Sequence, residues 1–237
     1  MKFAPIIYLI GMLLCILSLF MLIPAFVDWF YGSKDWPAFI ASSLTTLFVG
    51  GAFFLSARGS ATEHLELRQA FLLTNSAWIS IALFGSLPFL FSEINMSITD
   101  AIFESTSGIT TTGATVIDTL ESTSHGILIW RALLQWLGGV GIIVMALAIL
   151  PMLSIGGMQL FKTESYETPD KVVPKAASFA AGISIVYITL TVTWAFMLWV
   201  AGMPIFDSIA HAMTTLATGG YSTKSSSLAA FNSSTIE

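Results

Sequence analysis

The chain has 237 residues, of which 55% are hydrophobic and only 10% are charged, and its mean hydropathy is +0.84. Soluble domains carry about 25% charged residues, so this chain has too little charge to cover a water-facing surface, and most of its exterior must face lipid. The net charge of −5 and nine scattered Lys and Arg residues argue against a nucleic-acid-binding protein. The single cysteine, Cys15, excludes a disulfide framework and a cysteine-based zinc site.

Five apolar stretches are long enough to cross a bilayer, whose hydrocarbon core requires about 20 helical residues. They cover residues 4–29, 37–57, 70–91, 126–153 and 176–203. Short polar joints separate them. We therefore expect an all-α polytopic membrane protein.

The joints differ in charge. If the N-terminus is cytoplasmic, the inner side carries six basic residues: Lys2, Arg58, Arg68, Lys162, Lys171 and Lys175. The outer side then carries three: Lys34, Arg131 and Lys224. The positive-inside rule favours this orientation. The outer joints are acidic, which would raise the local cation concentration; their carboxylates are Asp28, Asp35, Glu93, Asp100, Glu104, Asp118, Glu121 and Asp207.

Two further segments, residues 97–115 and 204–223, are not spans. Each begins with about three potential helical turns, opened by Asp100 and Asp207, which are too short to cross a bilayer. Each then breaks into Thr and Gly, which are poor helix formers. A shift of 107 residues places Thr111 on Thr218, and it also places Gly113 on Gly220. This correspondence indicates an internal repeat.

The Thr/Gly segments have the composition of an ion-selectivity filter. Non-helical backbone at membrane depth must be buried or line water, and K⁺ channels use Thr-Val-Gly-Tyr-Gly strands whose carbonyls replace the hydration shell of the ion. Residues 218–222 (TGGYS) resemble that strand with two substitutions, and residues 111–115 (TTGAT) keep its Thr and central Gly. Glycine permits left-handed backbone that turns carbonyls toward one axis, and the C-terminus of a preceding short helix favours a cation. We expect K⁺ to be bound by Thr111, Thr112, Gly113, Thr218, Gly219 and Gly220.

Polar external loops are the alternative interpretation of these segments. A single Thr/Gly cluster after a helix would fit that interpretation equally well. Two copies, each preceded by a helix too short to span the membrane, make it the weaker one.

Three motifs carry a family resemblance: FESTSGITTTGAT (103–115), WRALLQWLGGVG (130–141) and AMTTLATGGYST (212–223). Together they resemble the Trk/Ktr/HKT potassium-uptake superfamily, and within it the bacterial TrkH/TrkG branch. The resemblance implies a K⁺-channel-like transporter fold, with repeated helix–pore-loop–helix units in pseudo-fourfold symmetry around one K⁺ pathway. Residues 1–67 would form a leading transmembrane helix pair, 68–157 the first unit, and 158–237 a second unit without its closing helix. We therefore expect the chain to be the N-terminal half of a longer protein.

The resemblance implies potassium uptake across a bacterial inner membrane, by the pore subunit of a Trk-type transporter or symporter. It implies no enzymatic activity and no cofactor, since K⁺ is the transported ion. The implied partners are a second copy of the intact protein and a cytosolic nucleotide-binding regulatory ring, with the joints at residues 58–68 and 159–175 as docking surfaces.

Three alternatives stay open at this point. The first is a Na⁺-selective member of the superfamily. Gly113 and Gly220 favour K⁺, because the resemblance associates serine in the first filter of some plant relatives with Na⁺. The second is a non-transporting membrane fragment or docking subunit. The third, a membrane-embedded enzyme, is disfavoured because no span carries a His-Glu-x-x-His motif or paired aspartates.

Several residues outside the Thr/Gly segments also permit two interpretations. Arg131 lies inside a span, where it would pair with Glu104 or Glu121, or else extend to the headgroups. His211 is either a titrating group at the pore mouth or a buried, hydrogen-bonded side chain. Two groups have simpler expectations. Gly138, Gly139 and Gly141 pack helices and admit the pore loop. The tryptophans near span ends occupy the membrane interface: Trp29, Trp36, Trp130 and Trp199.

Overall fold

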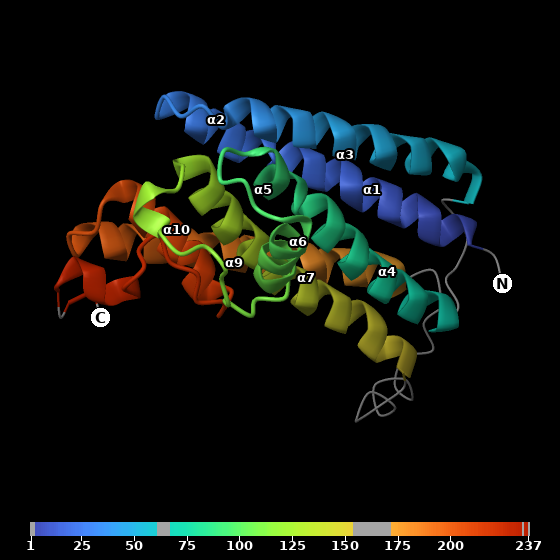
Figure 1. Ribbon diagram of the computed structural model, residues 1–237. Coiled ribbons are helices and arrows are strands. Elements are labelled where there is room, and N and C mark those ends of the chain that lie inside the picture. Colours follow the sequence, from blue (N-terminus) through green and yellow to red (C-terminus); the bar gives the residue numbers. More distant parts are fainter. Residues whose placement is uncertain (1–2, 61–66, 154–171, 234, 237) are drawn as a thin grey trace.

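The computed structural model describes residues 3–60, 67–153, 172–233 and 235–236. Throughout this part of the chain the secondary structure is helical, without strands (Figure 1). Four stretches within it are long and apolar enough to cross a membrane: Ala4–Phe30, Trp36–Ser56, Arg68–Phe91 and Ala181–Val200. A further helix of 29 residues, α7 (His125–Leu153), coincides with the remaining expected span. The predicted all-α polytopic fold is confirmed.

The N-terminal helices form a closely packed pair. α1 (Ala4–Phe20) and its continuation α2 (Leu22–Phe30) lie antiparallel to α3 (Trp36–Ser56) (Figure 1). Two glycines allow this approach: a Cβ on Gly11 would lie 2.8 Å from the Gly50 carbonyl oxygen, and one on Gly50 would lie 2.8 Å from the Leu14 Cβ. In membranes such small residues let helix backbones pack directly.

Proline explains two helix breaks. Pro24 follows the break between α1 and α2, and Pro88 follows the break between α4 (Leu67–Gly85) and α5 (Leu87–Phe91). A proline has no N–H for the carbonyl four residues earlier and its ring clashes with that carbonyl. α1 and α2 therefore form one membrane span with a bend, and so do α4 and α5.

The remaining elements repeat one order. A long helix, a short helix and a non-helical segment occur as α4–α5, α6 (Ile98–Ile109) and the first Thr/Gly segment (residues 111–115). They recur as α9 (Val172–Val200), α10 (Ile205–Leu216) and the second Thr/Gly segment (residues 218–222). Three 3₁₀ turns complete the described structure: η1 (Arg58–Ser60), η2 (Leu120–Ser122) and η4 (Ser227–Phe231). The predicted unit boundary at 157/158 falls outside the described residues.

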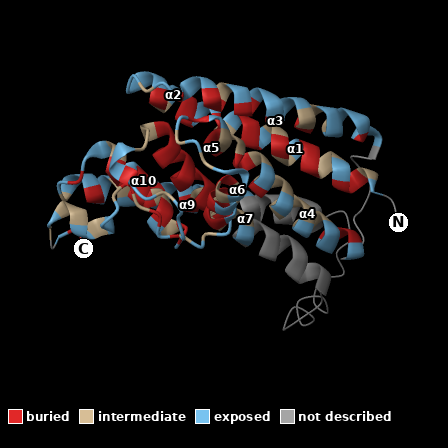
Figure 2. Ribbon diagram, viewed as in Figure 1, coloured by how far each residue is buried: buried red, intermediate tan, exposed pale blue. Residues whose placement is uncertain are grey.

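Helix α7 lies at the centre, where α2, α4, α6, α9 and α10 all contact it. Buried residues concentrate around it (Figure 2). Trp130 is fully buried and its indole N–H donates to the Gly85 carbonyl at 2.9 Å. The prediction that Trp130 lies at the membrane interface is therefore wrong, because its side of α7 faces α4 instead of lipid. Trp29, Trp36 and Trp199 are exposed, and their position at the membrane interface stays a prediction.

An aspartate from the leading pair binds the start of α7. The buried Asp28 carboxylate accepts the Gly126 N–H at 2.6 Å and the Ser124 hydroxyl at 3.2 Å. The first N–H groups of a helix lack internal partners, so a carboxylate is stabilising there. A Cβ on Gly126 would overlap this carboxylate. Glycine at position 126 is thus required by the contact that fixes α2 to α7.

Candidate ion-binding site

The two short helices begin as predicted. α6 and α10 have 12 residues each, about 18 Å of helix, which is too short to cross the hydrocarbon core. At the start of α6 the Ser97 hydroxyl accepts the Asp100 N–H at 3.1 Å. Asp207 occupies the first turn of α10, after Pro204. Acidic residues at helix N-termini are stabilised by the exposed N–H groups.

The short helices also end alike. The Thr111 N–H donates to the Gly108 carbonyl at 3.0 Å, and the Thr112 N–H donates to the Ser107 carbonyl at 2.9 Å. The same two bonds recur 107 residues later, from Thr218 to Thr215 and from Gly219 to Thr214, both at 2.9 Å. These bonds satisfy the last carbonyls of each helix and turn the chain out of it. The internal repeat predicted from the sequence therefore extends to individual backbone contacts.

In both Thr/Gly segments the first and third residues have left-handed backbone. φ is 57° at Thr111 and 80° at Gly113, and it is 54° at Thr218 and 77° at Gly220. The left-handed glycines were predicted, but the left-handed threonines were not. A β-branched residue at positive φ is rare, and strained backbone costs about 1–3 kcal/mol and concentrates at functional sites. The repeated strain indicates that both segments serve one function.

The two segments meet at their glycines. A Cβ on Gly113 would overlap the Gly219 carbonyl oxygen, and one on Gly219 would overlap the Gln135 side chain. No described atom lies within 4 Å of a Cβ on Gly220, which therefore borders open space. The hydroxyls of Thr110 and Thr112 lie 2.8 Å apart and form a hydrogen bond. The structure thus brings Gly113 of the first segment against Gly219 of the second, and the other four predicted site residues flank these two in the chain.

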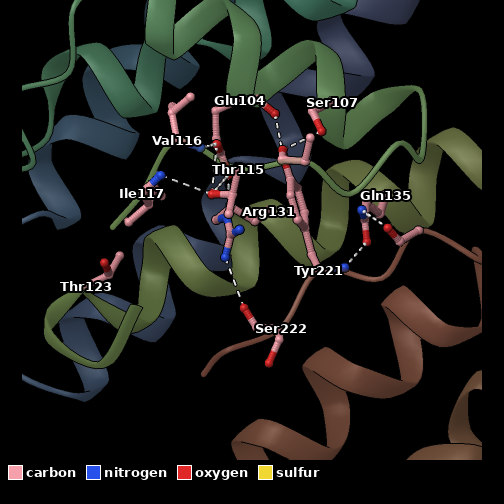
Figure 3. Close-up of polar contacts among 12 residues, drawn as sticks. Glu104, Ser107, Thr115, Val116, Ile117, Thr123, Arg131, Gln135, Tyr221 and Ser222 are labelled. Atoms are coloured by element: carbon pink, nitrogen blue, oxygen red, sulfur yellow. Dashed lines mark hydrogen bonds and ion pairs between the residues drawn. The ribbon is translucent and has the colours of Figure 1, made fainter. Parts of the chain in front are cut away.

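Gln135, on α7, holds the second segment by its backbone. Its side-chain N–H donates to the Gly219 carbonyl at 2.9 Å, and its side-chain oxygen accepts the Tyr221 N–H at 3.1 Å (Figure 3). Sequence reasoning missed Gln135. The signal that points to it is a lone amide inside an apolar span, one turn after Arg131.

Arg131 and Glu104 form a buried ion pair beside the segments. The guanidinium Nε donates to Glu104 Oε1 at 2.7 Å, and these side chains are 1% and 0% exposed. The pairing predicted with Glu104 is confirmed, and the alternatives of Glu121 or a side chain that reaches the headgroups are wrong. Glu104 also accepts the Thr115 hydroxyl at 2.9 Å and the Val116 N–H at 3.0 Å. The ion pair therefore binds the end of the first segment.

Tyr221 crosses from the second segment to the first. Its hydroxyl lies 2.9 Å from the Glu104 carbonyl and 3.2 Å from the Ala114 carbonyl, to either of which it can donate. The Arg131 guanidinium lies over its ring, 4.1 Å from the centroid, and donates to the Ser222 carbonyl at 3.0 Å. A cation over an aromatic face is attractive. Figure 3 shows these side chains between the two segments.

Seven of the eight outer carboxylates line a cavity, are buried, or both. Asp35, Glu93, Asp100 and Asp118 line one cavity of about 680 Å³. Four of the carboxylates predicted for the acidic rim are buried and bind protein groups: Asp28, Asp35, Glu104 and Asp207. Asp35 accepts the Glu93 N–H at 2.8 Å, and Asp207 accepts the Thr223 hydroxyl at 2.6 Å. The acidic rim is thus smaller than predicted, because these carboxylates accept hydrogen bonds from groups inside the protein.

Glu121 joins the outer loops of the two segments. It accepts the Ser225 N–H at 2.8 Å and the Ser225 hydroxyl at 2.7 Å. These hydrogen bonds from Ser225 hold the pKa of the Glu121 carboxyl below its ordinary value. The contact brings the chain after the second segment against η2.

His211 is a buried, hydrogen-bonded residue, which was one of its two predicted roles. Its ring nitrogens lie 2.8 Å from the Asp207 carbonyl and 3.1 Å from the Ser222 hydroxyl. Gly138 and Gly139 of α7 have the predicted close contacts, whereas no described atom lies within 4 Å of a Cβ on Gly141. A Cβ on Gly138 would overlap the Ile109 carbonyl at the end of α6, and one on Gly139 would lie 3.1 Å from Ala217, just after α10.

Comparison with known proteins supplies the family. A family model described as TrkH, cation transport protein, matches residues 36–237. The chain belongs to the TrkH family of cation transport proteins. This result confirms the resemblance to the Trk/Ktr/HKT superfamily and to its bacterial TrkH/TrkG branch.

Named relatives match this chain along its length. The Trk system potassium uptake protein TrkH of Salmonella typhimurium is 42% identical over 100% of the chain, and TrkG of Escherichia coli is 36% identical over 97%. The crystal structure of the potassium transporter TrkH from Vibrio parahaemolyticus superposes with a TM-score of 0.88 at 40% identity, covering all of this chain and 47% of that one. The chain spans about half the length of these relatives, 49% for the Salmonella protein.

Proposed function

We propose that the intact protein takes up K⁺ across the cytoplasmic membrane, through a selectivity filter to which the two Thr/Gly segments contribute two of the strands. One observation carries this proposal: left-handed backbone recurs at Thr111 and Gly113 and, with the same spacing, at Thr218 and Gly220. Alternation of this kind turns successive carbonyls in one direction, as a dehydrated cation requires. The named relatives are potassium uptake proteins, which supports K⁺ as the ion.

The backbone oxygens proposed to bind K⁺ belong to Thr111, Thr112, Gly113, Thr218, Gly219 and Gly220. The C-termini of α6 and α10 end at these segments, so their partial negative charge adds to that of the carbonyls. A carbonyl oxygen has two lone pairs. The Gly219 carbonyl oxygen accepts a hydrogen bond from Gln135 with one lone pair, and the other lone pair remains for the ion. The proposal assigns no enzymatic role to any residue.

We propose an inner-membrane location with a cytoplasmic N-terminus. Arg131 is buried in an ion pair, so it no longer counts among the outer basic residues, and the bias toward the N-terminal side increases. Lys2, Lys162 and Lys171 of that count lie outside the described residues. The family resemblance supports a homodimer of the intact protein, symport, and a cytosolic nucleotide-binding ring as further proposals, together with the assignment of residues 1–67, 68–157 and 158–237 to a leading pair and two units.

Ion uptake by the intact protein in bacteria that lack other K⁺ uptake systems tests the proposal. We expect growth at low K⁺ and Rb⁺ uptake that excess K⁺ suppresses and excess Na⁺ does not. Gly113→Ser is expected to weaken the preference for K⁺, because the new side chain meets the Gly219 carbonyl. Suppression by Na⁺ in preference to K⁺ would instead support the Na⁺-selective alternative. A folded protein that moves neither ion would support a docking subunit.

A further inference from the structure

Arg131 and Gln135 stand one helical turn apart on α7, so their side chains lie on the same face of that helix. Both are buried, at 1% and 0% exposure. Both contact the backbone of the second Thr/Gly segment, at residues 219, 221 and 222. Membrane helices rarely contain buried polar side chains without a functional reason.

The contact made by Gln135 resembles that of a neighbouring peptide group. It donates to the carbonyl of one residue and accepts the N–H of the residue two further on, and Gly220 lies between them in left-handed backbone. Because one partner is an acceptor and the other a donor, only one orientation of the amide satisfies both. Gln135 therefore fixes the backbone on both sides of the glycine that borders open space.

Arg131 extends this support to the first segment. Its guanidinium binds the Ser222 carbonyl and Glu104, and Glu104 in turn binds Thr115 and Val116. The planar fork of arginine can hold two partners in fixed directions, which a lysine ammonium cannot. One face of α7 thus holds both segments at a set separation.

We propose that Gln135 and Arg131 are positioning residues that determine ion specificity, by fixing the distance between the two Thr/Gly segments and the direction of the Gly219 carbonyl. The inference rests on the proposed filter role of those segments. Discrimination between alkali cations depends on the size of the carbonyl cage or on the field of its oxygens, and both change when a carbonyl shifts or loses a hydrogen-bond donor. Functional groups must be held within about 0.5 Å for such discrimination.

The test measures competition between K⁺ and Na⁺ for Rb⁺ uptake by the intact protein, with membrane abundance measured in parallel. Gln135→Leu removes both hydrogen bonds at similar volume, and we expect it to change the K⁺/Na⁺ ratio by about tenfold, the combined effect of losing two hydrogen bonds. Gln135→Glu keeps the acceptor for Tyr221 and loses the donor to Gly219. It should change the ratio even where folding is unaffected.

Arg131→Lys keeps the charge but loses the fork, so we expect normal abundance with altered selectivity. Exchange of the charges, Arg131→Glu with Glu104→Arg, should restore abundance more than selectivity, because a glutamate cannot donate to the Ser222 carbonyl. Trp136→Phe is the matched control. It removes a 3.0 Å hydrogen bond from α7 to Thr191 of α9, away from both segments, and should leave the ratio unchanged.

An unchanged K⁺/Na⁺ ratio in Gln135→Glu and Arg131→Lys at normal abundance would overturn the inference and leave the proposed function intact. A ratio that moves equally in Trp136→Phe would also overturn it. Wild-type uptake that prefers Na⁺ would overturn the proposed ion, while a further change of the ratio in Gln135→Glu would still support the positioning role. Absence of any ion uptake by the folded wild type would overturn both.

Discussion

The two Thr/Gly segments share a backbone but differ in the side chains that support it. Their turns, their left-handed residues and their helix lengths match across 107 residues. Glu104 and His211 occupy equivalent positions, and each binds the equivalent hydroxyl, Thr115 or Ser222. Only Glu104 also carries a full ion pair, with Arg131. The backbone geometry is therefore the repeated requirement, and different chemistry can satisfy it.

The aromatic side chain is a second difference. The Tyr221 hydroxyl contacts the first segment, whereas the counterpart of Tyr221, Ala114, has only a methyl group and cannot make the reverse contact. Support between the segments thus runs in one direction, and variants in the two copies should have unequal effects.

Removal of the ion pair should produce the largest difference. Glu104→Ala leaves Arg131 buried without its partner, which costs about 3–5 kcal/mol, and it frees the Thr115 end of the first segment. His211→Ala removes neutral hydrogen bonds worth about 1–3 kcal/mol. Thermal unfolding of the two purified intact variants compares them. Equal losses would show that the charge adds nothing to the first copy.

The left-handed glycines should come next. Gly113→Ala and Gly220→Ala both place a Cβ in left-handed backbone, at about 1–2 kcal/mol. Gly113→Ala additionally overlaps the Gly219 carbonyl, whereas Gly220→Ala enters open space. We expect both to lower stability, and Gly113→Ala to impair K⁺ selectivity more. The K⁺/Na⁺ uptake ratio checks this order, which a larger effect of Gly220→Ala would contradict.

The start of α7 has an anchor from the leading helices. Gly126→Ala should displace Asp28 from the start of α7 and destabilise the protein by about 1–3 kcal/mol, as overpacking does. Gly51→Ala is the control, since no described atom lies within 4 Å of a Cβ there. A lower melting temperature for Gly126→Ala alone is expected. Equal behaviour of the two variants would remove the role assigned to Asp28.

The smallest effect concerns pH at the outer loops. Because its pKa is lowered in the folded protein, Glu121 stabilises the contact with Ser225 above the ordinary pKa of about 4.5, and that contribution is lost as pH falls through the lower folded value. That contribution is constant between about pH 6 and 8, so the difference in uptake between Glu121→Gln and wild type should not vary with pH in this interval. A steep change in that interval, absent from the wild type, would contradict this assignment.

Periodicity and length sufficed for the spans, the short helices and the repeat, because lipid constrains helix length strictly. The partner of Arg131 was also predictable, since an arginine within a span needs a nearby carboxylate and few are available. The left-handed threonines were not predictable, because each is the residue after the C-cap of a short helix, a position that usually carries glycine instead of a β-branched residue. The contacts of Gln135 and Trp130 depend on which face of α7 meets the second Thr/Gly segment and which meets α4, and an apolar span has no periodic signal for this.

The bond between Asp28 and Gly126 has a consequence for how the protein assembles. Asp28 is synthesised 98 residues before Gly126, so the acceptor for the start of α7 is already present when that helix enters the bilayer. Helix ends in hydrocarbon are costly when their N–H groups are unsatisfied. The leading pair thus supplies the acceptor that the start of the central helix needs, from a part of the chain that is synthesised earlier.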